Sequence, residues 1–381
     1  MRTLYILGIR GLPAKHGGFE SFAERLALYL ISQKWKVAVY CQEDSGTEIW
    51  EDYWNGVKLI HIPIHYKKAT GTIIFDWKAT LHAARQEGLF LTLGYNTAIF
   101  CGLLRIKGLT NIINMDGLEW KRQKWNNVEK AWLYINELLG CWFGNHLIAD
   151  HPEIKNHLIT RVPPEKVTVI PYGADRVVKP EIDLLKNYNL EAYQYIIVIA
   201  RPEPENSILE IVSAFSRQKR GYKLLVLGKY YDDVSYHQEV KKAASEEVIF
   251  PGAIYEKEAV NALRFYARLY IHGHTVGGTN PSLVEAMSAT SPILAHDNKF
   301  NRWVAGVDAH YFSTEEECAQ QLDSLLDNEE TLNKMREGSL KRYNEEFAEE
   351  SDVKAYEKLF LKQLGKEFTG VDLSLDKQQV P

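Results

Sequence analysis

The chain has 381 residues, of which 45% are apolar, so it is too long for one ordinary α/β core and suits two domains. Its four cysteines are far apart and form no C-x-x-C pair, which argues against a disulfide framework or a cysteine zinc site and fits a reducing cytosol. With a net charge of −5, no nucleic-acid-binding motif and no run of roughly 20 apolar residues, the chain is expected neither to bind nucleic acid nor to span a membrane.

The chain opens with an apolar strand, a glycine-rich loop and an amphipathic helix. The strand is predicted at Leu4–Leu7 and the loop at Gly8–Gly18. Apolar side chains then recur at helical spacing, at Phe22, Ala23, Leu26, Ala27 and Leu30. Such an opening is typical of a doubly wound parallel sheet. The glycines allow close approach to a bulky or charged ligand, but their spacing is not G-x-G-x-x-G, which disfavours a nicotinamide cofactor. A glycine turn flanked by surface charges is the alternative.

Short apolar runs alternate with helical segments through the rest of the first half, which predicts a parallel sheet with helices on both faces. The expected strands are Val37–Cys41, Val57–Ile62, Leu89–Leu93, Ile112–Met115, His146–Ala149 and Val167–Ile170. The expected helices are Ile73–Arg85, Trp125–Gly140 and His151–Ile159.

Polar groups follow two of these strands, at the edge of the sheet where ligands of such folds are bound. Tyr95 and Asn96 follow one strand and could contact a ligand, or they could form a plain turn. Asp116 follows the other strand beside Gly117, with Glu119 three residues further on. An Asp-Gly pair is also a good turn without any function.

A polar stretch with Pro180 interrupts the pattern after Pro171, so we expect a first domain at residues 1–171, a hinge at 172–192, a second domain at 193–364 and a flexible tail at 365–381. The second domain is predicted to contain strands at Tyr195–Ala200, Leu224–Leu227 and Val248–Phe250, and helices at Ile208–Ser216, Glu256–Arg268 and within 315–364. Arg201 follows the first of these strands, where an arginine can bind a diphosphate through two parallel hydrogen bonds.

The most informative stretch runs from His272 to Asp297. Gly277 and Gly278 follow an apolar strand, and Pro281 then opens a helix predicted at Ser282–Ala289. A helix N-terminus presents unpaired N–H groups and the positive end of the helix dipole, which suits a phosphate group. We expect Ser282 to cap this helix and Glu285 to accept hydrogen bonds from sugar or ribose hydroxyls. His272 and His274 could suggest a metal, but no third ligand follows at a suitable spacing.

This stretch, G-G-T-N-P-S-L-V-E-A-M-S-A followed by S-P-I-L-A, resembles the nucleotide-sugar loop and helix of retaining glycosyltransferases of family 4. The opening G-I-R-G-L-P-A-K-H-G-G-F-E resembles the rhamnosyltransferase-like branch that builds bacterial surface polysaccharides. The resemblance covers residues 4–364. It implies an α/β fold of the GT-B type, with two Rossmann-like domains facing a central cleft and a C-terminal helix that crosses back to the first domain.

The resemblance also implies roles for individual residues. A catalytic or sugar-contacting role falls on Asp116, with Glu119 as its alternative, and Arg201 would neutralise the leaving diphosphate. The implied donor-binding residues are Gly17, Gly18, Lys229, Gly277, Gly278, Thr279, Asn280, Pro281, Ser282 and Glu285. The implied acceptor-binding residues are Arg10, His16, Glu20 and Tyr95.

Two positions depart from the family pattern. The lysine that follows the family's arginine is replaced by Asn206, and the first of two glutamates eight positions apart is replaced by Gly277. Lys229 could supply the missing charge, and the backbone N–H groups of Gly277, Gly278 and Thr279 could serve the sugar and phosphate.

These residues lead us to expect a metal-independent retaining glycosyltransferase, a hexosyl- or rhamnosyltransferase without cofactor. It would move a sugar from a nucleoside-diphosphate sugar to a glycan or polyprenyl-diphosphate-linked acceptor in surface polysaccharide synthesis. The absence of a D-x-D motif disfavours the metal-dependent glycosyltransferase scheme. A nucleotide-sugar epimerase on the same fold and a non-catalytic nucleotide-sugar-binding subunit are the alternatives.

Charge is distributed unevenly along the chain. Residues 1–180 hold 22 Lys+Arg and 17 Asp+Glu, whereas residues 181–381 hold 23 and 33, so the first half is expected to face an anionic partner. Its basic residues are mixed with aromatic ones, namely Lys67, Lys68, Lys107, Lys121, Arg122, Lys124 and Lys130 with Trp120, Trp125, Trp132, Trp142 and Phe143. This combination suits peripheral contact of a cytoplasmic protein with the inner face of the plasma membrane. A solvated basic face with tryptophans in the core is the alternative.

Overall fold

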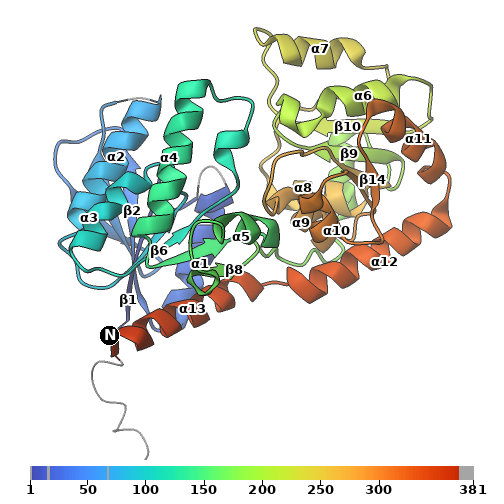
Figure 1. Ribbon diagram of the computed structural model, residues 1–381. Helices are drawn as coiled ribbons and strands as arrows, with labels where there is room; N and C mark the ends of the chain where they lie inside the picture. Colours follow the sequence, from blue (N-terminus) through green and yellow to red (C-terminus); the bar gives the residue numbers. More distant parts are fainter. Residues whose placement is uncertain (1, 15–17, 67, 369–381) are drawn as a thin grey trace, which may run out of the picture. The chain divides into compact units, whose positions relative to one another are not determined.

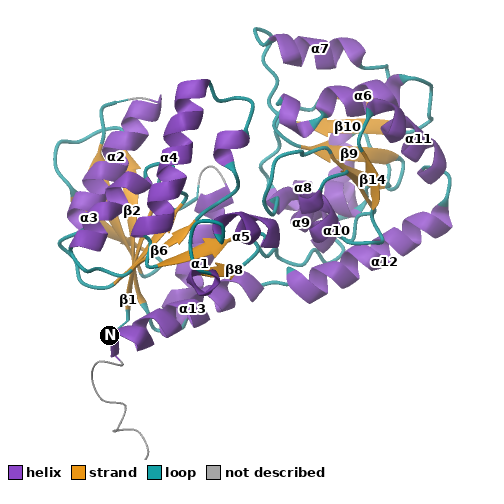
Figure 2. Cartoon of the chain, in the orientation of Figure 1, coloured by secondary structure: helices purple, strands orange, loops and turns teal. Residues whose placement is uncertain are grey.

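The computed structural model describes residues 2–14, 18–66 and 68–368 (Figure 1). The chain forms two compact units, one from Met1–Ile170 with Asp352–Pro381 and one from Pro171–Ser351. The polypeptide therefore passes between the units twice. Each unit contains its own sheet, flanked by helices (Figure 2).

The first unit is built on an eight-stranded sheet in the order β3-β4-β2-β1-β5-β6-β7-β8. Its strands are β1 (Thr3–Leu7), β2 (Lys36–Glu43), β3 (Trp50–Trp54), β4 (Val57–Pro63), β5 (Leu89–Leu93), β6 (Asn111–Asn114), β7 (His146–Ala149) and β8 (Val167–Val169). All neighbouring strands are parallel except β3 and β4. The strand order reverses between β1 and β5, so the carboxyl ends of these two strands flank the position where doubly wound sheets bind ligands.

The described residues of the first unit up to Ile170 form five α-helices, and all but the short third one were predicted. They are α1 (Gly18–Ser32), α2 (Lys68–Ala83), α3 (Cys101–Ile106), α4 (Asn127–Phe143) and α5 (Pro152–Leu158), with the 3₁₀ turns η1 (Ala98–Phe100), η2 (Glu119–Lys121) and η3 (Pro164–Lys166). The predicted inner face of α1 is buried. Asn126 caps α4 and forms a reciprocal capping box with Glu129, which explains where this helix begins.

The strand β3 was not predicted. Its sequence W-E-D-Y-W is mostly exposed at the edge of the sheet and lacks the apolar alternation of a half-buried strand. It pairs with β4 through a hairpin whose turn residues Asn55 and Gly56 both have positive φ, 46° and 83°. The Asn-Gly pair was therefore the available sequence signal.

The second unit contains a six-stranded parallel sheet in the order β11-β10-β9-β12-β13-β14. The strands are β9 (Tyr195–Ile199), β10 (Lys223–Leu227), β11 (Val248–Ile249), β12 (Leu269–His272), β13 (Ile293–His296) and β14 (His310–Phe312). Alternate residues of β9 enter different cores, with Tyr195 and Ile197 in one and Ile196 and Val198 in the other. Both faces of the sheet are therefore buried, which explains the continuous apolar runs of its strands.

The helices of the second unit are α6 (Ile208–Ser216), α7 (Ser235–Ala243), α8 (Lys257–Phe265), α9 (Pro281–Ser288), α10 (Lys299–Ala305), α11 (Glu315–Leu325) and α12 (Glu329–Glu346), with η4 (Ile182–Tyr188) and η5 (Pro204–Asn206). Residues 172–192, expected to form a hinge, lie within this unit. In this segment Leu185 is buried and the carbonyl of Pro180 accepts a hydrogen bond from the Tyr266 hydroxyl at 2.8 Å. Among the described residues, no helix has the length and apolar character needed to cross a bilayer.

The last helix, α13 (Ser351–Phe368), packs on the first unit (Figure 1). The Tyr356 hydroxyl accepts a hydrogen bond from Asn114 Nδ2 at 2.7 Å. The Glu357 carboxylate accepts from the Tyr29 hydroxyl at 2.9 Å and from Trp35 Nε1 at 3.0 Å. The expected return of the C-terminal helix to the first domain is thus confirmed, and residues 352–364 group with the first unit rather than the second. Of the expected flexible tail, residues 365–368 continue α13 and residues 369–381 lie outside the described residues.

Candidate functional site

Two basic residues lie at neighbouring positions on the carboxyl edge of the second sheet. Ile199 of β9 is paired with Leu227 of β10, and each strand is followed two residues later by an exposed basic side chain, Arg201 and Lys229 respectively. The Lys229 Nζ lies 5.3 Å from the centroid of the Tyr231 ring. A hydrogen bond to the Tyr231 phenol raises the pKa of Lys229, so this side chain is charged at neutral pH. The edge therefore offers two cations to an anionic ligand.

The glycine loop after β12 contributes backbone N–H groups to the same edge. Asn280 caps α9, because its Oδ1 accepts from the Ser282 N–H at 3.0 Å and its carbonyl accepts from the Leu283 N–H at 3.1 Å. Pro281 has no N–H to offer. The expectation that Ser282 caps the helix is therefore wrong, since Ser282 lies inside the helix and its Oγ is 2.8 Å from the Tyr270 hydroxyl.

Because of this capping, the backbone N–H groups that remain without an acceptor lie in the loop before the helix. The N–H groups of Gly277 and Gly278 have no acceptor among the described residues, whereas Thr279 is buried and is bonded. Gly278 has a φ of 123°, a conformation that side-chain-bearing residues rarely adopt. Two adjacent free amides are a suitable arrangement for phosphate oxygens.

The arginine loop and the glycine loop pack directly against each other. The Glu205 carbonyl accepts from the backbone N–H of Thr275 at 2.9 Å and from its hydroxyl at 3.0 Å. Asn206 Nδ2 donates to the Arg201 carbonyl at 2.8 Å, and Asn206 Oδ1 lies 2.7 Å from His274 Nδ1. Asn206, which the resemblance places at a lysine position, is only 7% exposed and connects the two loops. It supplies no charge to a ligand.

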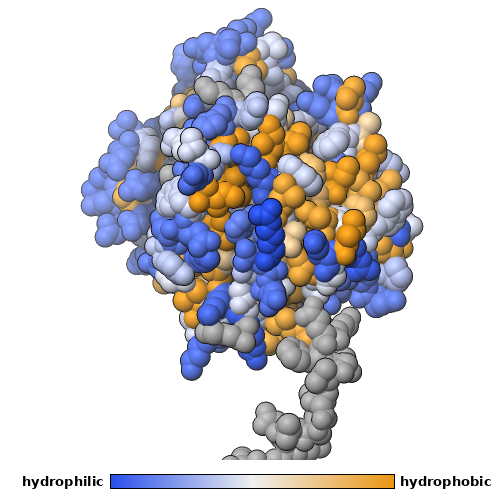
Figure 3. Space-filling model, turned by 90° about the vertical axis from the view of Figure 1, so that its left-hand side faces the viewer, coloured by the Kyte–Doolittle hydropathy of each residue, from blue (hydrophilic) through white to orange (hydrophobic). Residues whose placement is uncertain are grey.

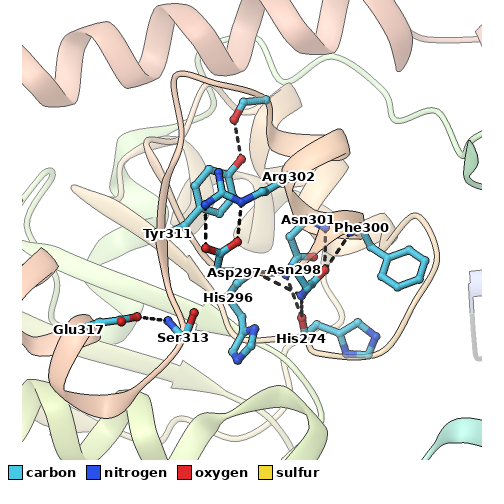
Figure 4. Close-up of polar contacts among 11 residues, drawn as sticks. His274, His296, Asp297, Asn298, Phe300, Asn301, Arg302, Tyr311, Ser313 and Glu317 are labelled. Carbon is cyan, nitrogen blue, oxygen red and sulfur yellow. Dashed lines mark hydrogen bonds and ion pairs between the residues drawn. The ribbon is translucent and has the colours of Figure 1, made fainter. Parts of the chain in front are cut away.

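Residues from the loop after β13 hold the glycine loop from its other side (Figure 4). The His274 carbonyl accepts from Asn298 Nδ2 at 3.1 Å and from Asn301 Nδ2 at 2.9 Å. Asn298 also caps α10 through the N–H groups of Phe300 and Asn301, both at 3.0 Å. A Cβ at Gly277 would overlap with the Phe300 ring, so the loop fits only a glycine there without rearrangement. This support was not predicted, although an asparagine between a strand and a helix is an N-cap signal.

Glu285 on α9 is oriented by an arginine that was not predicted. Arg264 of α8 is 5% exposed, and its Nη2 donates to Glu285 Oε2 at 2.5 Å and to Ser282 Oγ at 3.2 Å. The Glu285 side chain remains 45% exposed, so part of its carboxylate is accessible to a ligand hydroxyl. The buried guanidinium therefore positions the carboxylate without covering it.

The two histidines near this edge do not form a metal site with acidic or thiol groups. Burial lowers the pKa of His272 to about 3, so its imidazole is neutral in the folded chain. His274 follows the strand and bonds to Asn206. Within residues 2–14, 18–66 and 68–368 there is no cluster of three His, Cys, Asp or Glu side chains that could hold a metal ion.

In the first unit, the loop after β1 packs against the end of β5. Gly8 has a φ of 84°, and a Cβ there would overlap with the Leu93 carbonyl. Glu20 Oε1 accepts from the backbone N–H of Arg10 at 3.3 Å, so this predicted acceptor ligand also stabilises the loop. The Arg10 side chain is exposed, and Gly18 is the first residue of α1. The predicted site residues His16 and Gly17 lie outside the described residues.

Asp116 occupies an unusual backbone conformation at the end of β6. Its φ is 49°, and its N–H donates to Asn114 Oδ1 at 2.9 Å. Burial, with a further contribution from the Glu119 carboxylate, raises the pKa of Asp116 to about 6. The Glu119 carboxylate is itself engaged by Arg122, by Trp125 Nε1 at 3.3 Å and by Lys124 at 3.8 Å. Asp116 is therefore the carboxyl group better suited to exchange a proton near neutral pH.

The Tyr95 hydroxyl stabilises the turn that contains Asp116. It is only 1% exposed, and its hydroxyl donates to the Gly117 carbonyl at 3.2 Å and accepts from the Glu119 N–H at 2.9 Å. The next residue, Asn96, is exposed, and its carbonyl accepts from Trp132 Nε1 at 2.9 Å. The geometry therefore gives Tyr95 a positioning role.

The predicted site residues gather within each unit at the carboxyl edge of its sheet. In the second unit these are Arg201, Lys229, Gly277, Gly278, Thr279, Asn280, Pro281, Ser282 and Glu285. In the first unit these are Arg10, Gly18, Glu20, Tyr95, Asp116 and Glu119.

Two family models match different parts of the chain. Residues 1–175 match a family described as a domain of unknown function (DUF1972), and residues 183–342 match glycosyl transferases group 1. No curated protein matches the sequence. The second match supports a glycosyltransferase.

Several solved structures are similar over almost the whole chain. Sucrose-phosphate synthase from Thermosynechococcus elongatus has a TM-score of 0.77 at 16% identity and covers 98% of this chain and 100% of its own. The Anabaena protein HepE in complex with UDP-glucose has a TM-score of 0.73 at 13% identity, covering 96% and 100%. A glycosyltransferase from Rickettsia africae has a TM-score of 0.71 at 15% identity, covering 95% and 98%. At these identities the likeness shows the fold, which is that of the two-domain GT-B proteins.

Proposed function

We propose that the chain is a metal-independent, retaining glycosyltransferase that takes its sugar from a nucleoside-diphosphate sugar. The observation that carries the proposal is the edge of the second sheet, where Arg201, Lys229 and the free N–H groups of Gly277 and Gly278 lie on adjoining loops. Within a domain that matches glycosyl transferases group 1, this is an arrangement for a diphosphate.

The proposed chemistry breaks the bond between the sugar and the diphosphate and forms a bond between the sugar and an acceptor hydroxyl, which loses its proton. The leaving diphosphate carries the developing negative charge. The two amides would stabilise that charge without having to reorganise, because the packing of their loop already positions them. Arg201 would add a positive charge from the adjoining loop. Glu285 would bind a hydroxyl of the sugar or ribose, and Asp116 would contact the sugar or the acceptor.

The donor and the acceptor are proposed from similarity. HepE has been solved with UDP and with UDP-glucose, and other similar structures are UDP-forming trehalose-phosphate synthases, which favours a UDP-hexose. The resemblance of the opening glycine loop to the rhamnosyltransferase-like branch favours dTDP-rhamnose. The same resemblance points to a glycan or polyprenyl-diphosphate-linked acceptor in surface polysaccharide synthesis, to retention of the anomeric configuration, and to a cytoplasmic protein that meets its acceptor at the membrane.

Thermal unfolding in the presence of different nucleotide sugars tests the binding part of the proposal. A true donor at about 100 times its dissociation constant should stabilise the folded chain by about 2.7 kcal/mol, which is a shift of several degrees in a melting curve. UDP-glucose and dTDP-rhamnose should give different shifts, and the larger shift identifies the donor class.

Arg201→Ala tests the catalytic part. We expect release of diphosphate to fall by about 10²–10³-fold while the melting temperature without ligand stays unchanged, because the Arg201 side chain is exposed. Arg217→Ala is the matched control, since Arg217 is an arginine of the same unit whose side chain pairs with Glu315 and Glu316. Near-normal turnover of the Arg201 variant would refute its assigned role.

A non-catalytic nucleotide-sugar-binding subunit is the second candidate, favoured by the uncharged Asn206 and by Gly277 at the family's glutamate position. Such a subunit would give the thermal shift but would release no diphosphate with any acceptor extract. An epimerase would convert the donor without an acceptor, so incubation with donor alone separates it from both.

A further inference from the structure

The first unit carries an exposed apolar surface that the proposed reaction does not use. We call it the α4 surface and define it by Trp77 of α2, Ile99 of η1, Ile106 of α3, and Trp132, Ile135 and Trp142 of α4. These side chains are between 38% and 85% exposed. Figure 3 shows the side of the molecule where hydrophobic residues gather with hydrophilic ones between them.

Contacts between the elements make this surface continuous. The rings of Trp77 and Phe100 lie 5.2 Å apart, which joins α2 to η1. The Ile99 N–H donates to Asn136 Oδ1 at 2.9 Å, which joins η1 to α4. A Cβ at Gly102 would lie 3.1 Å from the Phe143 ring, so α3 packs closely against the end of α4.

Helix α4 carries apolar residues on both of its faces. Its inner face buries Leu133, Gly140 and Cys141 against the unit, together with the bonded polar side chains of Asn136 and Glu137. Trp132, Ile135 and Trp142 recur at helical spacing on the outside and remain exposed. A surface helix of a globular protein normally presents polar residues to water. The outer stripe of α4 is therefore expected to contact something other than water.

The charges around the α4 surface favour an anionic partner. Residues 66–145 hold ten Lys+Arg and six Asp+Glu. At least four of these six acids are engaged within the unit, since Asp76 accepts from the Thr97 hydroxyl, Glu129 belongs to the capping box of α4, and Glu119 and Glu137 pair with Arg122 and Arg161. Arg105, Lys107 and Lys121 are exposed, so the rim of the surface is basic.

We propose that the α4 surface docks the first unit on an anionic lipid bilayer. Tryptophan and isoleucine side chains would enter the boundary between headgroups and acyl chains, while the basic rim would bind anionic headgroups. In a two-fold dimer the same surface of each copy would meet, so the two basic rims would repel each other, whereas anionic headgroups would attract them. Lipid is therefore the occupant that the chemistry favours over a second copy of the chain.

Docking in this way also explains how a lipid-linked acceptor would reach the site, a step that rests on the proposed function. Trp132, at one end of the α4 surface, holds the carbonyl of Asn96. Asn96 adjoins Tyr95, whose hydroxyl holds the turn of Asp116 and Glu119. A short series of contacts therefore connects α4, the helix proposed to face the lipid, with the turn of Asp116, the carboxyl group proposed to contact the sugar or the acceptor.

Co-sedimentation of the full chain with vesicles tests the proposal. We expect binding to phosphatidylglycerol vesicles, weaker binding at high salt, and little binding to phosphatidylcholine vesicles. The double variant Ile106→Ser/Trp142→Ser removes two side chains of the surface, and Arg105→Glu/Lys107→Glu reverses its rim. Each should reduce the bound fraction by at least tenfold. Val307→Ser and Tyr255→Ser are matched controls, because both residues are more than 80% exposed on the second unit.

Three outcomes would overturn the proposal. The chain could fail to bind phosphatidylglycerol vesicles, or the controls could lose binding as much as the double variants. Sedimentation velocity could also show a dimer that Ile106→Ser/Trp142→Ser converts to a monomer, which would identify a second copy as the occupant. The donor-induced thermal shift, measured without vesicles, is independent of all three. A lost vesicle interaction with an intact shift would refute only the docking, and an intact vesicle interaction without a shift would refute only the proposed function.

Discussion

At the scale of single residues, Asp116 combines the clearest signs of a functional group. Its raised pKa means that folding favours the protonated form, because the ordinary value of 3.8 becomes about 6 in the folded chain. The protonated Asp116 carboxyl therefore stabilises the folded chain below pH 4, and this stabilisation is lost as the pH rises through 6. The ionised carboxylate therefore destabilises the folded chain at neutral pH.

Asp116→Asn should therefore raise stability and lower activity at the same time. We expect the variant to match the wild-type free energy of unfolding near pH 4 and to exceed it by on the order of 1–2 kcal/mol at pH 7.5. Asparagine also tolerates the positive φ of this position. Turnover should fall by about 10²-fold or more. Denaturant unfolding at several pH values and a diphosphate-release assay measure the two effects.

Asp76→Asn is the matched control for this prediction. Burial also raises the pKa of Asp76 to about 6, but its carboxylate is bonded to the Thr97 hydroxyl at 2.7 Å and lies outside the proposed site. The control should show the same dependence of stability on pH with unchanged turnover. A loss of turnover in both variants would mean that the Asp116 effect arises from the fold.

At the scale of elements, the loop before α9 gives a physical reason for the glycine at position 277, where the glycosyltransferases that the sequence resembles have a glutamate. Even a Cβ at this position would overlap with the Phe300 ring of α10 unless the ring moved. Gly277→Ala should lower the free energy of unfolding by about 1–3 kcal/mol through overpacking and should weaken the donor-induced thermal shift. Phe300→Ala should relieve the overlap, so the double variant should be less destabilised than the sum of the two single variants. Additive effects would show that the ring does not limit this position.

Elements with strong apolar patterns could be predicted from the sequence, and elements defined by their neighbours could not. Leu89–Leu93, His146–Ala149 and Ile208–Ser216 were predicted with the bounds that the structure has, since each is a dense apolar segment bounded by turn residues. β3, α3, α7, α10 and β14 were missed, because they are short or mostly polar.

The same distinction applies to the candidate site. Arg201, Lys229 and Gly278 could be placed because strand ends and glycines are visible in the sequence. Arg264 and Asn301 could not, because their roles depend on contacts with Glu285 and His274 across more than 20 residues of sequence. A buried arginine and a buried asparagine inside a helix have no sequence signal that names their partners.

At the scale of the whole molecule, the two passages of the chain between the units make the first unit depend on the last segment of the sequence. Tyr356 and Phe360 of α13 are almost fully buried in it, and Arg25 pairs with Asp352. Losing a buried aromatic side chain typically destabilises a protein by about 3–5 kcal/mol, and a domain is stable by only about 5–15 kcal/mol. Removal of α13 would also leave Asn114 Nδ2 without its partner, the Tyr356 hydroxyl.

Ending the chain at Glu350 should therefore unfold the first unit selectively. In scanning calorimetry we expect the full chain to show a contribution from each unit, and the truncated chain to lose or strongly lower the transition of the first unit while the second keeps its own. A chain that ends at Phe368 is the control, since it retains the whole of α13, and it should melt like the full chain. Phe360→Ala leaves the chain length unchanged. It should lower the free energy of unfolding of the first unit by about 3–5 kcal/mol and leave that of the second unit unchanged. Equal lowering of both transitions would show that the units unfold as one cooperative body, and that α13 stabilises both of them.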